Sequence, residues 1–379
     1  MSETIYKAVK CRIHPNKNQQ VLIQQHFGCA RFVYNWALAL QNRYYKFFKK
    51  SISRTRLQNQ LVKKKDHPKY VWLKEVNSQA LLSSLLHVHT AFSNFFKGRA
   101  KFPRFKSKKI PQRAYQCPQH CTLDINSQRL NVPKIKGIKA KITQDIQGKI
   151  KTVTISQSAT GKYYASVLIE TSEHVPKPTM IDTNQTIGID LGLEYFLIQS
   201  DGVKIENPRY FQRSQTRLGI SQKIFSRKKK TSKNYQHQKR LVASSHEKVR
   251  HQRLNQHHQL THKLIRENQA TSYAVEDLGI KNMVKNAKLS KAISDVGWGQ
   301  FLTLLKYKAK WNGKNVLEIG RFVPSSKVCS YCGYTCDQMP LHIRTWTCQD
   351  CDSVHDRDIN ASINIRNFAL ADALGRSAV

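Results

Sequence analysis

Four cysteines near the C-terminus have the spacing of a metal site. Cys329 and Cys332 form one Cys-x-x-Cys pair, and Cys348 and Cys351 form a second pair after an intervening segment of fifteen residues. Each pair can place two thiolates on one tight turn, and two such turns that face each other complete a tetrahedral zinc site. Because a four-cysteine site leaves no open coordination position, it stabilises structure and does not catalyse. The sequence therefore predicts one structural zinc ion held by these four residues.

The alternative for these cysteines is a pair of disulfides, which the rest of the sequence disfavours. Residues 1–10 lack the apolar core of a secretory signal peptide, so the chain is expected to be soluble and cytoplasmic. In that reducing compartment, nine cysteines are typical of metal ligands and small buried residues. Cys336 lies between the two pairs and off their spacing. We expect it to be a spare thiol, with replacement of one paired cysteine as the alternative.

Three acidic residues have the types and positions that metal-dependent phosphodiester cleavage requires. Asp190 follows the apolar strand-like run Ile187-Gly-Ile, Glu276 ends the strand-like run Tyr273-Ala-Val, and Asp358 opens a helical pattern. A carboxylate in apolar surroundings is unfavourable unless it is neutralised or bound to a metal. Three that converge can hold two Mg²⁺ ions about 3.5–4 Å apart, one activating water and the other stabilising the leaving oxygen. The three acids are thus predicted to be catalytic and magnesium-binding.

Each acid also has a structural alternative. Asp190 could be a turn residue, Glu276 could form an ion pair at a strand end, and Asp358 could be a helix N-cap. Asp356 is the rival of Asp358 for the third metal position. The other acids near these segments are interpreted as surface or turn residues: Glu194, Asp201, Asp277 and Asp350.

The charge of the chain indicates its partners. Sixty-four Lys and Arg residues face twenty-four Asp and Glu residues, which gives a net charge of +40. Like charge on this scale favours a polyanionic partner, and nucleic acid is the usual one. A membrane surface is disfavoured because no basic amphipathic helix with a Leu or Trp face stands out, and no apolar stretch reaches the ~20 residues that span a bilayer. Candidate nucleic-acid contacts are Arg104, Lys106 and the run Arg227, Lys228, Lys229 and Lys230.

The elements that must position these residues fall into two groups. Residues 4–14 alternate like a strand, 16–97 are mostly helical, and 112–172 contain several short strands. Residues 171–186 show no periodicity and carry two prolines, so a domain boundary is expected there.

The second group begins at residue 187 and places the acids in a recognisable order. Three strands are followed by a long, basic helical segment (205–268), a strand that ends at Glu276, one helix over 291–312, a strand at 315–319 and a last helix. Acids on the first strand, the fourth strand and the last helix are typical of an RNase H-type fold. The cysteine segment is inserted before the last helix.

Several segments together resemble the TnpB (OrfB) family of transposon-encoded RNA-guided endonucleases, relatives of the type V CRISPR effectors. The resemblance covers nearly the whole chain and is most specific in its last part. Three departures are an additional cysteine at 336, Cys11 in place of an aromatic residue, and Asp352 where the second cysteine turn usually has glycine. The segments that carry it are Lys7-Ala-Val-Lys-Cys-Arg-Ile-His-Pro-Asn-Lys, Arg31-Phe-Val-Tyr-Asn-Trp, Asn94-Phe-Phe-Lys-Gly, Phe102-Pro-Arg-Phe-Lys, Ile187-Gly-Ile-Asp-Leu-Gly, Val275-Glu-Asp-Leu, Pro324-Ser-Ser-Lys-Val-Cys-Ser-Tyr-Cys-Gly, Arg344-Thr-Trp-Thr-Cys and His355-Asp-Arg-Asp-Ile-Asn-Ala.

The resemblance implies an α/β multidomain fold. Asp190, Glu276 and Asp358 correspond to the family's metal-binding acids. The implied domains are a wedge β-barrel (1–15 and 98–180), a helical recognition domain (16–97), a RuvC-like, RNase H-like nuclease domain (187–325 and 355–379) and a zinc ribbon (326–354).

The implied function is RNA-guided, Mg²⁺-dependent cleavage of DNA beside a short target-adjacent motif. The expected partners are a guide RNA derived from the transposon end and double-stranded target DNA, with no membrane. Base pairing would supply sequence specificity while the protein reads duplex shape. Two alternatives stay open: a guide-free DNA nuclease or transposase, and a nuclease-inactive RNA-guided DNA-binding repressor.

Overall fold

The computed structural model describes residues 3–109, 113–144, 146–340 and 342–375. Its chain divides between His174 and Val175 into two compact units. The N-terminal unit is Thr4–His174, and the C-terminal unit contains Val175 and the residues after it together with the first three residues. Among the helices that the structure describes, none combines the length and the apolar character needed to cross a membrane.

The N-terminal unit contains a seven-stranded antiparallel sheet. The barrel expected from the sequence is an open sheet among the described residues, with β2 and β3 at its two edges. Alternate residues of β7 are buried, as a sheet with one covered face requires. The strand order is β2-β6-β7-β1-β5-β4-β3, and the strands are β1 (Thr4–His14), β2 (Arg113–Cys117), β3 (Thr122–Asp124), β4 (Arg129–Val132), β5 (Ile135–Lys141), β6 (Lys149–Gln157) and β7 (Tyr163–His174).

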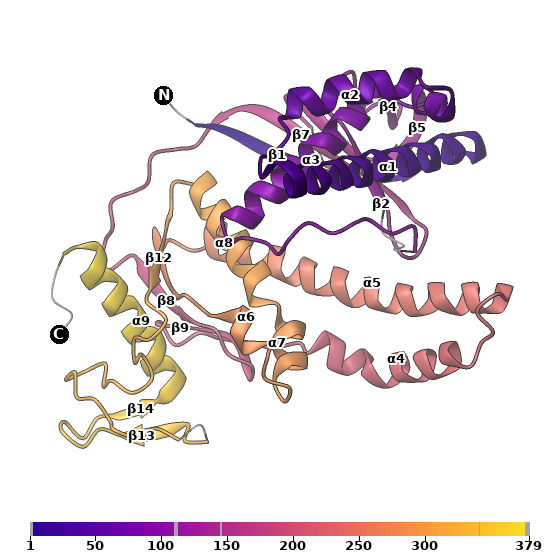
Figure 1. Ribbon diagram of the computed structural model, residues 1–379. Coiled ribbons are helices and arrows are strands. Elements are labelled where there is room, and N and C mark those ends of the chain that lie inside the picture. The colour runs from indigo at the N-terminus through magenta and orange to yellow at the C-terminus, as the bar shows by residue number, and fades with distance from the viewer. Residues whose placement is uncertain (1–2, 110–112, 145, 341, 376–379) are drawn as a thin grey trace. The chain divides into compact units, whose positions relative to one another are not determined.

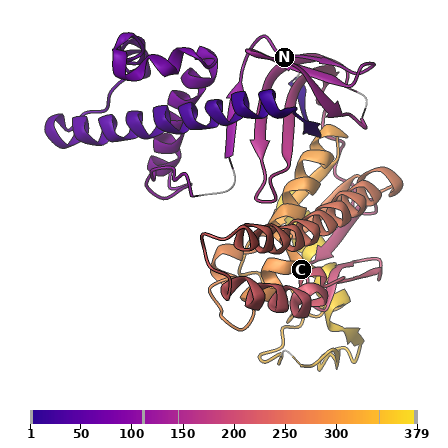
Figure 2. The ribbon, with the colours of Figure 1, turned by 90° about the vertical axis from the view of Figure 1, so that its right-hand side faces the viewer.

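Helix α1 connects the sheet to a separate cluster of helices in this unit (Figure 2). It begins at a capping box. The Asn16 side chain accepts a hydrogen bond from the Gln19 backbone N–H, and the Gln19 side chain accepts one from the Asn16 backbone N–H. Its first half packs Ile23 and Phe27 into the core of the sheet, and its second half packs into the helical core. The helices are α1 (Lys17–Phe48), α2 (Arg54–Asp66), the 3₁₀ helix η1 (Pro68–Lys74) and α3 (Ser78–Phe96).

The C-terminal unit contains a five-stranded mixed sheet, and its strands follow the order along the chain that the sequence predicted. β11 is parallel to both β8 and β12, whereas β9 is antiparallel to β8 and to β10. Strand order in the sheet is β10-β9-β8-β11-β12. The strands are β8 (Thr186–Asp190), β9 (Tyr195–Gln199), β10 (Lys204–Glu206), β11 (Ser272–Glu276) and β12 (Asn315–Ile319).

The helices of this unit are more divided than the prediction: the segment 205–268 forms two main helices, and a short helix follows β11. The expected single helix over 291–312 is two helices, α7 and α8, divided at Gly297. Gly297 has a φ of 70°, a left-handed conformation that favours glycine and ends α7. The helices are α4 (Tyr210–Ser226), α5 (Lys233–His262), the π-helical turn η2 (Lys263–Glu267), α6 (Ile280–Met283), α7 (Ser290–Val296), α8 (Trp298–Trp311) and α9 (Arg357–Ala373).

Two helices cover opposite faces of the five-stranded sheet. α8 packs on the face that carries Ile189 and Val275, and α9 packs on the face that carries Ala274. Gly188 lies on the α9 face, where an added Cβ would be 1.9 Å from the Ser362 carbonyl oxygen. Only glycine therefore allows α9 to lie this close to β8. α4 and α5 form an antiparallel hairpin that extends away from the sheet (Figure 1).

The cysteine segment is an insertion between β12 and α9. It contains two short antiparallel strands, β13 (Thr345–Thr347) and β14 (Val354–Asp356). β14 ends at the residue before α9 begins, so the inserted segment and the last helix are continuous. Figure 1 shows the two strands beside the N-terminal end of α9.

Candidate active site and zinc centre

The structure brings Asp190 and Glu276 to neighbouring strand ends. β8 and β11 are parallel and pair Ile189 with Val275, so the next residue of each strand is one of the two acids. Because side chains alternate across a sheet, both acids lie on the face of Gly188 and Ala274. That face is the one covered by α9.

Asp358 enters the same site from the first turn of α9. The N-cap of α9 is Asp356, whose Oδ1 accepts hydrogen bonds from the backbone N–H groups of Asp358 and Ile359 at 3.1 and 3.0 Å. The other carboxylate oxygen of Asp356 forms an ion pair with Lys204 at 2.5 Å. Asp356 is thus engaged on both oxygens in capping and pairing, whereas the side chain of Asp358 is free of the cap. This geometry favours Asp358 over Asp356 as the third acid.

The three acids interact electrostatically. Removal of Asp190 from water, together with the negative charges of Glu276 and Asp358, raises the pKa of Asp190 to about 7. Glu276 and Asp358 thus both lie near enough to Asp190 to disfavour its charged form. A cation bound beside these carboxylates would offset their mutual repulsion.

Two further side chains contact the acids, and analysis of the sequence did not single them out. Ser325 Oγ donates a hydrogen bond to Glu276 Oε1 at 2.6 Å. The Arg344 guanidinium pairs with Asp358 at 3.1 Å and with Glu194 at 2.6 Å. Glu194, interpreted from the sequence as a surface residue, therefore lies at the edge of the site. Ser325 and Arg344 both lie in segments that carry the family resemblance, and this position is the feature of the sequence that could have identified them.

The remaining acids lie outside the site. Asp277 pairs with Arg321 at 2.6 Å, Asp201 accepts a hydrogen bond from the backbone N–H of Val203 within its own turn, and Asp350 is exposed in a turn.

The four predicted cysteines converge. Their sulfur atoms all lie within 4.8 Å of one another, with Cys329 and Cys351 3.7 Å apart and Cys332 and Cys348 3.6 Å apart. Four sulfurs that surround one zinc ion tetrahedrally at about 2.3 Å are separated by about 3.8 Å. A hydrogen bond with Ser353 lowers the pKa of the Cys351 thiol to about 6, which favours the thiolate that a metal requires. The donor set therefore fits a structural zinc ion.

The two cysteine turns have the same backbone geometry. Cys329 and Cys348 accept hydrogen bonds from the N–H groups of Gly333 and Asp352. Gly333 has a φ of 83° and Asp352 a φ of 55°. Both positions require a left-handed backbone, which glycine adopts freely and aspartate tolerates better than most residues. The departure from glycine at 352 is therefore compatible with the turn.

Two other side chains border the cysteine group. His355 Nε2 lies 3.0 Å from Cys329 Sγ and stacks near Trp346, with ring centroids 4.9 Å apart. Outer contacts of this kind orient metal ligands. Cys336 packs against the group without belonging to it, as expected for a spare thiol.

The candidate nucleic-acid contacts lie in different surroundings. Arg227, Lys228, Lys229 and Lys230 are exposed in the turn that joins α4 to α5. Arg104 is exposed in its loop. Lys106 is held by the Asn35 side chain, which bonds its backbone N–H and carbonyl, and its Nζ lies 4.1 Å from the centre of the Tyr34 ring. Arg104 is thus the more available cation of that pair.

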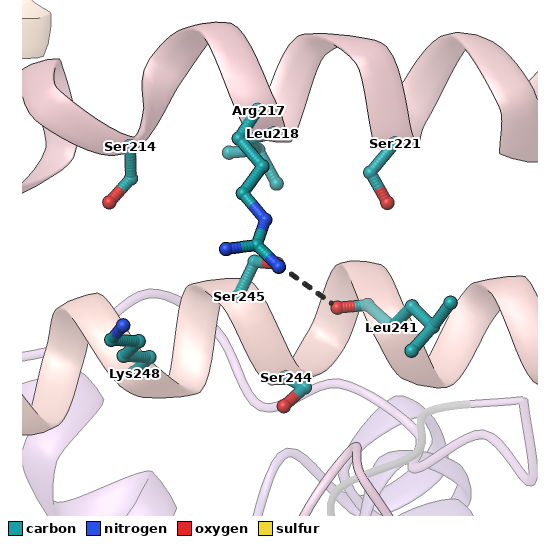
Figure 3. Close-up of a pocket in the computed structure, with 8 residues that line it drawn as sticks. All are labelled: Ser214, Arg217, Leu218, Ser221, Leu241, Ser244, Ser245 and Lys248. Atoms are coloured by element: carbon teal, nitrogen blue, oxygen red, sulfur yellow. Dashed lines mark hydrogen bonds between the residues drawn. The ribbon is translucent and has the colours of Figure 1, made fainter.

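A polar slot of about 350 Å³ separates α4 from α5 (Figure 3). Its serines are small enough to let the helices approach, and Gln238 bonds across the hairpin to Ser221. Two cations and no acid line the slot. The lining residues are Ser214, Arg217, Leu218, Ser221, Leu241, Ser244, Ser245 and Lys248.

Comparison with protein families gives three matches along the chain. Residues 166–287 match the OrfB_IS605 model, described as "Probable transposase". Residues 298–365, which contain the cysteine insertion, match the "Cas12f1-like, TNB domain". Residues 1–50 match a model described as "Helix-turn-helix domain", although the structure forms β1 and the single helix α1 there.

Individual proteins are similar over nearly the whole chain. A Streptomyces pristinaespiralis protein named "Putative RNA-guided DNA endonuclease" is 35% identical over 373 residues, 98% of this chain and 91% of that protein. The Escherichia coli K12 protein "Putative RNA-guided DNA endonuclease InsQ" is 33% identical, over 95% of this chain and 91% of its own. In fold, the chain is similar to the protein in the cryo-EM structure of a Cas12f1–sgRNA–target DNA complex. Their TM-score is 0.57 at 12% identity, covering 96% of this chain and 99% of that one.

Replacing one cysteine tests the zinc centre. We expect Cys348→Ser to lose its zinc and to melt at a lower temperature, because three ligands hold the ion less tightly and its binding stabilises the fold. Cys336→Ser is the matched control and should keep one zinc per chain. Zinc content by elemental analysis and thermal melting measure both effects; one zinc per chain in Cys348→Ser would show that the ligands are misassigned.

The raised pKa of Asp190 predicts how the stability of magnesium-free protein depends on pH. The folded state holds the Asp190 proton up to about pH 7, while a free carboxyl loses it near its ordinary value of 3.8. Stability contributed by this group is therefore present below pH ~4 and is lost as pH rises to about 7. Asp190→Asn, which cannot ionise, should be more stable than wild type at pH 8, and the difference should shrink toward pH 5.

Thermal melts of zinc-containing protein in magnesium-free buffer at both pH values measure this difference. Asp201→Asn is the matched control, because Asp201 lies in an exposed turn. An Asp190→Asn stability difference that stays constant between pH 5 and pH 8 would contradict the assignment of a raised pKa.

Proposed function

The chain belongs to the TnpB (OrfB) family of RNA-guided DNA endonucleases encoded by IS605-type transposons, and we propose that Asp190, Glu276 and Asp358 carry its DNA cleavage reaction. The observation that supports this assignment is that Asp190 and Glu276 stand at neighbouring ends of β8 and β11, on the face that α9 covers with Asp358 in its first turn. All three are also partly buried.

The donor set of these acids fits magnesium. Carboxylate oxygens are the ligands that Mg²⁺ prefers, and its remaining positions are usually filled by water and substrate phosphate. When bound there, the proposed pair of magnesium ions supplies an activated water and stabilises the leaving oxygen of a phosphodiester. Asp190, Glu276 and Asp358 would hold the ions, with Asp190 the acid on which the charges of both others act.

The chain's own residues arrange the site around these carboxylates. Ser325 fixes one oxygen of Glu276, and the capped first turn of α9 fixes the backbone of Asp358. The positive end of the α9 dipole also favours negative charge at this point. Arg344, which pairs with Asp358 and Glu194, adds a cation beside the acids that can attract the phosphate of a DNA strand.

The partners of the enzyme are a guide RNA and double-stranded target DNA. We propose that the exposed run Arg227–Lys230 at the end of the α4–α5 hairpin contacts nucleic-acid phosphates, with Arg104 as a second contact point. Base pairing with the guide would supply target specificity, leaving the protein to hold the duplex through its backbone.

We also propose family roles for the parts of the fold. The C-terminal unit is assigned as the RuvC-like, RNase H-like nuclease domain, supported by its strand order and its acids. The insertion is assigned as a zinc ribbon, supported by the cysteine geometry. The N-terminal sheet is assigned as the wedge domain, and the α1–α3 cluster as the recognition domain.

Two other functions were compatible with the sequence. A nuclease-inactive repressor is disfavoured because all three acids are present and converge. A guide-free nuclease or transposase would use the same site, so only the requirement for RNA distinguishes it.

Substitution of Asp190 tests the catalytic assignment. We expect Asp190→Ala to reduce cleavage of guide-matched DNA to background, because the acid next to both others is removed. Binding of guide RNA and target should stay within about twofold of wild type, since no phosphate contact is lost. Asp201→Ala should cleave normally. Cleavage by a wild-type protein freed of RNA would favour the guide-free alternative, and undiminished cleavage by Asp190→Ala would refute the site.

Neutralising the basic turn tests the nucleic-acid surface. Changing Arg227, Lys228, Lys229 and Lys230 to glutamine should weaken RNA binding and flatten the dependence of log K on log salt, because each lost phosphate contact lowers the slope by about 1. Changing Lys281, Lys285, Lys288 and Lys291 to glutamine is a charge-matched control. Equal salt slopes for the two variants would mean that the basic turn is only a solvated surface.

A further inference from the structure

The hydroxyl of Ser325 is the point where the zinc segment meets the acid site. Ser325 lies between β12 and the first cysteine turn and is 7% exposed. Its Oγ donates to Glu276 Oε1 at 2.6 Å, across 49 residues of sequence. The contact leaves the second oxygen of Glu276 available to another ligand.

Two buried asparagines of α9 hold the backbone of Ser325 and of the residues that follow it. Asn364 Nδ2 donates to the carbonyl oxygens of Ser325 at 2.8 Å and of Val328 at 2.6 Å. Asn360 Nδ2 donates to Val328 O at 2.7 Å, and its Oδ1 accepts from the N–H of Ser330 at 2.9 Å. Ser330 follows the zinc ligand Cys329 directly, so the same helix that carries Asp358 holds the first cysteine turn.

Ordinary helix packing does not require these residue types. Asn360 and Asn364 are 1% and 3% exposed, and a buried amide is unfavourable unless its hydrogen bonds are made. Apolar residues would pack α9 against a neighbour without that requirement. Among the described residues, the hydrogen bonds of both side-chain amides go to the segment 325–330, so these amides fix the position of that backbone against α9.

We infer that Ser325 is a positioning residue for the metal-binding carboxylate of Glu276, and that Asn360 and Asn364 couple its position to the first zinc turn. This inference rests on the proposed function. A hydrogen bond to one oxygen of a metal-binding carboxylate orients the other toward the ion, and loss of such outer contacts typically lowers metal affinity or activity about 10–100-fold. The zinc segment thereby orients a catalytic acid from the sheet as well as completing the fold.

The first experiment compares Ser325→Ala with Ser326→Ala. Ser326 is the adjacent serine and is more exposed. Mn²⁺ binding to the RNA complex without DNA is titrated by calorimetry, and single-turnover cleavage is measured against Mg²⁺ concentration. We expect Ser325→Ala to bind Mn²⁺ about tenfold more weakly and to need correspondingly more Mg²⁺ for half-maximal cleavage. Ser326→Ala should match wild type, and Ser325→Thr, which keeps the hydroxyl, should recover at least part of the loss.

The second experiment tests the coupling through α9. Asn364→Ala should show the same weakening of Mn²⁺ binding as Ser325→Ala, whereas Asn367→Ala, on the exposed face of the same helix, should not. The double variant of Ser325 and Asn364 should lose no more than the larger single effect, since both act through one carboxylate. If Asn364→Ala does not fold, the Ser325 comparison decides the inference alone.

The outcomes separate this inference from the proposed function. Mn²⁺ binding and cleavage by Ser325→Ala that equal those of Ser326→Ala would overturn the positioning role while leaving the nuclease assignment intact. Loss of zinc or of thermal stability in Ser325→Ala, in proportion to the lost activity, would overturn it in favour of a purely structural role. If the wild type cleaves no DNA, the proposed function fails, and the Mn²⁺ titration still reports on Ser325.

Discussion

The close approach of α9 to β8 is the constraint on which the nuclease half of this protein depends. A Cβ at residue 188 would lie 1.9 Å from the Ser362 carbonyl oxygen, so the helix can rest on the strand only where the side chain is absent. That contact brings the first turn of α9, with Asp358, to the strand ends that carry Asp190 and Glu276. A shift of the helix outward by one side chain would separate the third acid from the other two.

The charge of the protein makes this arrangement informative. With 64 basic and 24 acidic residues, a carboxylate has many possible cationic partners, and Asp277 and Glu318 are indeed paired with Arg321 and Lys306. Asp190 is instead surrounded by protein and by two further acids, which raises its pKa to about 7. Mutual repulsion of this kind is tolerated where a metal ion restores neutrality, and it marks functional sites more often than structural ones.

The cysteine insertion is tied to the same helix from its other side. It begins after β12 and ends at Asp356, the N-cap of α9. Asn360 and Asn364 hold its first turn by hydrogen bonds to the backbone, and Ser325 extends the contact to Glu276. A zinc ion that closes the two turns would therefore restrict the same segment from which Ser325 reaches the acid. The insertion, the last helix and the acids form one hydrogen-bonded assembly.

The sequence by itself determined the ligand types, the order of the elements and the family. Two Cys-x-x-Cys pairs fix four sulfurs on two turns by local geometry, and the apolar runs before Asp190 and Glu276 indicate strands through their composition. The break at Gly297 was signalled locally but was missed, because helical periodicity continues on both sides of it. Only the tertiary structure decided that Asp356 caps α9 while Asp358 faces the site, and that Ser325 and Arg344 contact the acids. Those outcomes depend on how deeply α9 docks and which way its first turn faces, and distant residues set both.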